Sequence, residues 1–247
     1  MIAIRTASEL DRMKKSGAIL RDCFLEIEKE LRPGVTTGEL DGIAEGFIRS
    51  RGAVPAFKGY QGYPANICAS VNEQVVHGIP GPRELKAGDI VGIDIGVLFD
   101  EYYADASRTY GIGEVTEEAE RLMRVTKEAL QRAIDLARQG THLSDISHAI
   151  QTHAEGAGYQ VVRTLVGHGI GRRMHEEPQI PNFGAPGRGP LLEAGMVLAI
   201  EPMVNVGAFD VLTLEDKWTY VTVDGKLSAH FEDTVAVTEG GPLVLTR

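Results

Sequence analysis

The chain has 247 residues, of which 43% are apolar and 24% are charged, and its formal net charge is −10. This size and composition are typical of a globular protein that buries a substantial core. The negative charge argues against nucleic acid as the main partner, because phosphate binding depends on a basic surface. No apolar run approaches the roughly 20 residues that cross a bilayer, so no membrane partner is expected.

The beginning of the chain and its cysteine content bear on the compartment. Arg5 and Glu9 interrupt the first ten residues, which do not resemble a targeting signal. Cys23 and Cys68 are the only cysteines, so two thiols in a reducing compartment are expected rather than a disulfide framework. We therefore expect a cytoplasmic protein.

The first half of the chain predicts two helices and a strand. Thr6 and Glu9 have capping-box spacing ahead of a helical segment that ends near residues 33–34, and a second helix is expected over 37–51. Residues 90–99 alternate apolar side chains with Asp94 and Gly96, which predicts a strand whose Asp94 faces away from the apolar side.

Asp94 and Asp105 are the sharpest local signal. A turn near residues 99–101 would fold two strands back on each other and bring both carboxylates to one face, with Cβ atoms about 5 Å apart. Two such carboxylates repel each other unless a positive charge lies between them. Two solvated surface aspartates are the alternative.

The second half repeats the first. Helices are expected over 117–138 and 144–155, and the Pro33-Gly34 turn matches Gln139-Gly140 at an offset of 106. Leu85-Lys86-Ala87-Gly88 before Asp94 matches Leu192-Glu193-Ala194-Gly195 before Glu201 at an offset of 107. We interpret this as one internal duplication, with halves of approximately 1–115 and 116–247 related by a pseudo-twofold axis within a single catalytic domain.

The remaining candidates lie in the second half. His168 stands among glycines that lack the GxGxxG spacing, so a ligand-reaching histidine is a better interpretation than a dinucleotide loop. Glu201 ends a buried apolar run, where an unpaired carboxylate would be costly. Glu232 is expected on the second arm of a hairpin that turns at Asp224-Gly225. His230 is left undecided.

These segments together closely resemble the type I methionine aminopeptidase family over essentially the whole chain. The strongest matches are residues 59–64 (GYQGYP), 72–80 (NEQVVHGIP) and 167–178 (GHGIGRRMHEEP), with the five metal-ligand positions in order. The resemblance implies the α/β (α+β) pita-bread fold, in which two halves with an antiparallel sheet and outer helices enclose the site. It also implies removal of the initiator methionine ahead of a small second residue.

The resemblance assigns roles to individual residues. The implied ligands of two divalent metal ions are Asp94, Asp105, His168, Glu201 and Glu232. Glu201 is expected to carry the proton, with His175 donating to the scissile carbonyl and His77 holding the amide of the second residue. The implied methionine pocket is lined by Phe57, Tyr60, Tyr63, Cys68, Met174 and Trp218.

The ligand types bear on the metal. Mostly oxygen ligands favour Mn²⁺, Fe²⁺ or Co²⁺, with Zn²⁺ also possible. The expected substrates are the amino-terminal methionines of peptides and nascent proteins, so the ribosome is a further candidate partner, and a monomer is expected. Phe57, Met174 and Gly96 depart from family forms that carry a cysteine, an aromatic residue and a threonine, which bears on specificity and rate.

Two rival interpretations remain. An Xaa-Pro aminopeptidase or prolidase would use the same ligands, but such enzymes usually carry a separate amino-terminal domain. A pita-bread binding module without catalysis would generally have lost metal ligands.

Overall fold

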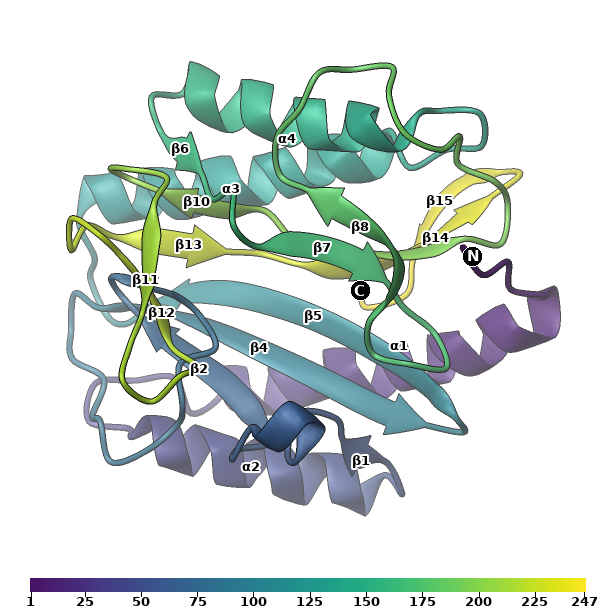
Figure 1. The fold of residues 1–247 in the computed structure, drawn as a ribbon. Coiled ribbons are helices and arrows are strands. Elements are labelled where there is room, and N and C mark those ends of the chain that lie inside the picture. The colour runs from purple at the N-terminus through teal and green to yellow at the C-terminus, as the bar shows by residue number, and fades with distance from the viewer.

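The computed structural model describes residues 1–247, and the strands lie between two pairs of helices (Figure 1). The helices are α1 (Ala7–Glu28), α2 (Thr37–Ser50), α3 (Glu117–Asp135) and α4 (Leu143–Gly156), with a 3₁₀ turn η1 (Tyr60–Gly62). None of them is long and apolar enough to cross a membrane. The four predicted helices are therefore present, although α1 and α3 end earlier than expected.

The helix boundaries follow from capping chemistry. Thr6 accepts a hydrogen bond from the backbone N–H of Glu9, whose side chain bonds back to the Thr6 backbone, so the predicted capping box is present. Thr36 and Glu39 form the same box at α2. The α1 helix ends at Glu28, and a turn at Lys29 and Glu30 follows it.

The strands form four antiparallel groups. One contains β1 (Val54–Pro55), β2 (Ile67–Val71), β4 (Ile90–Phe99) and β5 (Tyr102–Gly111). A second contains β7 (Val166–Gly169), β8 (Glu176–Pro181), β9 (Val197–Ile200), β14 (Asp233–Thr238) and β15 (Gly241–Val244). The others are β6 (Gln160–Val161) with β10 (Met203–Asn205) and β13 (Ser228–His230), and β3 (Gln74–Val76) with β11 (Val211–Thr213) and β12 (Tyr220–Thr222).

The duplication seen in the sequence recurs in the fold. The α4 helix begins and ends 106 residues after α2, and β6 follows β1 by the same interval. The bridge between Thr36 and Glu84 recurs between His142 and Leu191. One buried apolar cluster lies within residues 20–112, and a second lies within residues 119–237 apart from Ile90. Each half thus packs its own helix pair against its own strands.

The two halves join along one seam. The end of β5 and the segment 230–234 run side by side, and Ser107 and Glu232 exchange backbone hydrogen bonds of 3.3 and 2.9 Å. Threonine hydroxyls reinforce the seam, since Thr234 Oγ1 donates to the Asp105 carbonyl at 2.7 Å and Thr109 Oγ1 donates to the His230 carbonyl at 2.7 Å. The seam therefore fixes side chains of one half against those of the other.

Candidate metal centre

Asp94 and Asp105 lie on one face of a hairpin, as the spacing predicts. The β4 and β5 strands pair from Ile90 opposite Gly111 to Phe99 opposite Tyr102. Asp94 is opposite Ser107, while Asp105 is opposite Gly96, so the two aspartates are diagonal neighbours. Asp100 and Glu101 form the two-residue turn, with φ of 48° and 70°. Positive φ at both positions is the signature of a type I′ turn, whose twist matches the flanking strands.

Glu232 reaches the same place from the other half. It lies between β13 and β14 at the seam, where its backbone bonds to Ser107, and its side chain is 2% exposed. The hairpin predicted at Asp224-Gly225 is wrong. The β12 strand pairs with β3 and β11, whereas β13 pairs with β10, so the chain passes between sheets here. Asp224 shapes the loop by accepting hydrogen bonds from the Ala208 and Lys226 backbones.

His168 lies on β7, and one of its two ring nitrogens is engaged in a hydrogen bond to the backbone. Its Nδ1 lies 2.9 Å from the Gly169 carbonyl oxygen, and donation there leaves the Nε2 lone pair free. The flanking glycines are explained by strand packing. A Cβ on Gly167 would lie 2.5 Å from the Ala199 carbonyl oxygen, and one on Gly169 would lie 2.1 Å from that of Glu177. Neighbouring strands thus approach the histidine closely on both sides.

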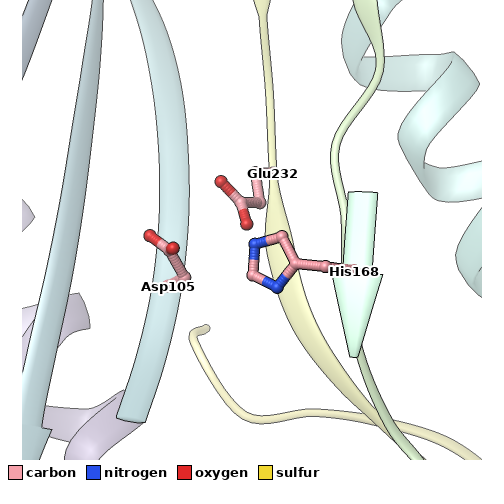
Figure 2. A group of neighbouring side chains, drawn as sticks. All are labelled: Asp105, His168 and Glu232. Carbon is pink, nitrogen blue, oxygen red and sulfur yellow. The ribbon is translucent and has the colours of Figure 1, made fainter. Parts of the chain in front are cut away.

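Glu201 follows the buried strand β9 and lies between two imidazoles. Its Oε1 is 3.7 Å from Nε2 of His168, and its Oε2 is 3.6 Å from Nε2 of His230. The side chain keeps 14% of its exposure, which leaves one edge facing a cavity. Figure 2 shows Asp105 of β5, His168 of β7 and Glu232, which lies between β13 and β14, pointing toward one another.

All thirteen residues predicted for the site line one cavity of about 280 Å³. The lining also includes Gln61, Val76, Thr164, Leu165, Val166 and Met203, which the sequence reasoning did not single out. These residues come from loops and strand ends of both halves, without a local pattern that marks them.

The acidic residues and His168 in the cavity have strongly shifted pKa values. Burial raises the pKa of Asp105 to about 7, opposed by its hydrogen bond with Asp94. Burial, reinforced by the neighbouring carboxylates, also raises the pKa values of Asp94, Glu201 and Glu232 well above their ordinary range. Burial lowers the pKa of His168 to about 3, so its ring is neutral at pH 7.

The donor set fits divalent cations. No lysine or arginine is among the cavity-lining residues, and Asp94 Oδ1, Asp105 Oδ1 and Glu232 Oε1 are buried without hydrogen-bond partners. Two groups could each hold an ion, namely Asp105 with His168 and Glu232, and Glu201 with His230 and Glu232. Asp94 belongs to neither group but lies beside Asp105. Several carboxylates buried together are stable only if they are protonated or if a cation neutralises them. A bound cation would also give the unpaired oxygens the partner that they lack.

The remaining wall of the cavity is largely apolar and begins beside Asp94, which is opposite Cys68 in the pairing of β2 with β4. Phe57, Tyr63, Cys68 and Met174 form one buried cluster, against which Tyr60 and Trp218 pack. Both cysteines of the chain are free and buried, and burial raises the pKa of Cys68 well above its ordinary range. Cys68 therefore stays a neutral thiol and contributes apolar, polarisable surface.

Two further histidines line the cavity. The Tyr60 hydroxyl is 2.6 Å from Nδ1 of His175, whose ring centroid is 4.2 Å from that of His168. Desolvation lowers the pKa of His175, so its ring is neutral at pH 7. His77 has φ of 60° and packs edge-on against Trp218 and Tyr220. A residue other than glycine with positive φ has a strained backbone conformation, and such residues cluster at functional sites.

The profile of metallopeptidase family M24 matches residues 11–239 of the chain. The chain belongs to this family. A methionine aminopeptidase of Clostridium perfringens (strain 13 / Type A) is 55% identical over 246 residues, covering 100% of this chain and 99% of the relative. The crystal structure of methionine aminopeptidase from Rickettsia prowazekii superposes with a TM-score of 0.99 at 42% identity, covering 100% of both chains.

A more distant structure shares the fold alone. The Xaa-Pro dipeptidase of Bacillus anthracis superposes with a TM-score of 0.79 at 24% identity, covering 99% of this chain and 62% of that chain. The expected pita-bread architecture, with two related halves, antiparallel strands and outer helices, is therefore confirmed.

We expect Gly96 and Phe57 to be sterically coupled. A Cβ on Gly96 would lie 2.6 Å from Cε1 of Phe57 and 3.1 Å from the Ala56 Cβ. Gly96→Ala should therefore lower the free energy of unfolding by about 1 to 3 kcal/mol and push the ring into the cavity. The cost should shrink in a Phe57→Ala background, as measured by urea unfolding in a double-mutant cycle.

Gly92→Ala is the matched control for this cycle. It lies in the same strand, where a Cβ would meet no atom closer than 3.6 Å. An equal cost of Gly96→Ala with and without the Phe57 ring would contradict the coupling.

Proposed function

We propose that the chain is a metal-dependent methionine aminopeptidase that removes the initiator methionine from peptides and nascent proteins, preferring a small second residue. Residues 1–247 act as one catalytic domain built from halves that divide near residue 115. The cofactors are two divalent ions of the Mn²⁺, Fe²⁺, Co²⁺ or Zn²⁺ class. The enzyme works as a cytoplasmic monomer at or near the ribosome.

One observation carries this proposal. A cluster of buried carboxylates and a neutral imidazole shares a single cavity with an apolar, sulfur-containing recess. The cluster suits hydrolysis of an amide, and the recess suits an unbranched thioether side chain. Full-length identity of 55% to a methionine aminopeptidase supports the same assignment, whereas the Xaa-Pro dipeptidase shares only 24%.

The metal ligands would be Asp94, Asp105, His168, Glu201 and Glu232. Two divalent cations bound to them would polarise the scissile carbonyl and make water a stronger nucleophile. The free amino group that only the first residue of a peptide carries would bind in the same centre, which restricts cleavage to the first bond. Glu201, with one edge open to the cavity, accepts the proton lost by the attacking water and returns it to the leaving amine.

His175 is set up to donate a hydrogen bond. The Tyr60 hydroxyl is 2.6 Å from Nδ1, and with that hydroxyl as the donor a neutral ring carries its proton on Nε2. Nε2–H then stabilises the charge that builds on the carbonyl oxygen, while His77 holds the amide of the second residue. Phe57, Tyr63, Cys68, Met174 and Trp218 surround the methionine side chain.

Replacing His175 by alanine should lower kcat by about 100-fold to 1000-fold, because one donor to a developing oxyanion is lost. Tyr60→Phe should lower kcat less, since the ring remains but its tautomer is no longer selected. Both values come from steady-state hydrolysis of Met-Ala-Ser. A His175→Ala enzyme with wild-type kcat would remove His175 from the mechanism.

The function itself is tested by comparing two peptides. Metal-loaded protein should release free methionine from Met-Ala-Ser and leave Ala-Pro-Ser intact, as followed by chromatography of the products. Cleavage of Ala-Pro-Ser without cleavage of Met-Ala-Ser would instead indicate an Xaa-Pro peptidase. Cleavage of neither peptide by protein that contains both ions would contradict the proposed function.

A further inference from the structure

His230 is a buried histidine of the site to which neither the sequence resemblance nor the proposed mechanism gives a role. It ends β13 opposite Met203, and it is 4% exposed. Its backbone N–H donates to Thr109 Oγ1 at 3.0 Å, and its carbonyl accepts from the same hydroxyl at 2.7 Å. The seam between the two halves therefore holds this residue in place.

The ring of His230 is aimed at two carboxylates without bonding to either. Nε2 lies 3.6 Å from Glu201 Oε2 and 4.0 Å from Glu232 Oε2, and it has no hydrogen-bond partner although it is buried. Both separations exceed the length of an N–H···O hydrogen bond. A buried ring nitrogen without a partner requires an explanation.

The same separations suit atoms that share a cation. Ligand bonds of about 2.0 to 2.2 Å place two ligands of one ion at most roughly 4.2 Å apart. His168 Nε2 is 3.7 Å from Glu201 Oε1, which is nearly the distance of His230 from the other oxygen. Glu201 thus has an imidazole nitrogen at a ligand-like separation from each of its oxygens.

We propose that His230 Nε2 is a further protein ligand for the cation held by Glu201 and Glu232. The proposal rests on the metal dependence of the proposed function and adds to its five ligands. A second imidazole shifts the ligand set toward nitrogen, so the site should favour Co²⁺, Fe²⁺ or Zn²⁺ over Mg²⁺ and Ca²⁺. His230 also ties metal binding to the seam, because Thr109 on β5 holds its backbone.

Cobalt titration of the metal-free full chain tests this. Wild-type protein and His230→Ala are titrated with Co²⁺ by calorimetry and by visible absorption. We expect the affinity of one of the two ions to fall at least 10-fold in His230→Ala, since loss of a ligand should cost no less than loss of a group that only orients one. The visible spectrum of that ion should also change.

Two further variants keep the result interpretable. His148→Ala removes an exposed histidine on α4 and should bind both ions as wild type does. His230→Phe keeps a ring of similar size without a nitrogen lone pair, so full Co²⁺ affinity in this variant together with loss in His230→Ala would mean that the ring only fills space and would overturn the proposal. Circular dichroism and thermal unfolding identify any variant that fails to fold.

Proton NMR of the Co²⁺ protein gives a direct count of the imidazole ligands. We expect two strongly shifted, exchangeable ring N–H signals in wild type and one in His230→Ala. A single such signal in wild type, or unchanged Co²⁺ affinity in folded His230→Ala, would overturn the proposal. If wild type still cleaves Met-Ala-Ser, the proposed function survives that outcome.

Discussion

Glu201→Gln is expected to lower kcat for Met-Ala-Ser by about 10² to 10⁴-fold, because the amide can neither accept nor return the proton. Glutamine keeps nearly the same shape, so the cavity should stay intact. Glu201 also lies between His168 and His230, so some loss of metal affinity is expected as well. Steady-state kinetics at saturating metal concentration measure the fall in kcat while both ions stay bound, so the effect on the chemical step is not confused with weaker metal binding.

The matched control is Glu193→Gln, an exposed glutamate that precedes β9 in the same half of the chain. This variant should keep wild-type kcat and metal content. If Glu201→Gln with two bound ions turned over Met-Ala-Ser as fast as Glu193→Gln, Glu201 would not be the proton carrier.

Chelation of divalent ions is expected to abolish hydrolysis and to lower the melting temperature. Ions that bind the folded chain at 100 times their Kd contribute roughly 2.7 kcal/mol per site. For a chain of this size that corresponds to about 5 to 11 °C per site. Differential scanning calorimetry with and without Mn²⁺ measures the shift, and an identical melting temperature in both conditions would argue against a metal centre.

The metal-free protein should also lose stability as the pH rises. Asp105 has a folded pKa of about 7 against an ordinary 3.8, so between these values the folded state binds more protons than the unfolded state. Its contribution to stability is therefore complete below pH 3.8 and is lost as the pH rises through 7. From pH 7 to 8 the buried histidines His77, His168 and His230 are neutral in the folded state and largely neutral in the unfolded state. Melting temperatures in chelator should therefore fall over this range, and added Mn²⁺ should reduce the slope.

Local signals in the sequence account for much of the fold. One capping box and several turn residues predict the four helices, and one apolar alternation with a short turn predicts the β4 and β5 hairpin that carries Asp94 and Asp105. The offset of 106 predicts that α2 and α4 are equivalent. These features depend on residues close in the chain, or on a comparison of the chain with itself.

Pairings between distant segments were not predictable in the same way. The segment after Asp224-Gly225 crosses to a different sheet, because β13 finds its partner in β10 rather than in β12. The seam between Ser107 and Glu232 joins segments more than 100 residues apart, and no local pattern indicates it. His230 did carry a signal, since it stands two residues before Glu232 and so shares its face in an extended segment.

The central claim is that side chains from both halves hold two cations on either side of Glu232. Anomalous diffraction from crystals grown with Mn²⁺ tests it most directly. We predict two anomalous peaks in the cavity, one within bonding distance of Asp105, His168 and Glu232 and the other within bonding distance of Glu201 and Glu232. Peaks only at the protein surface, or no peak in the cavity of an active preparation, would contradict it.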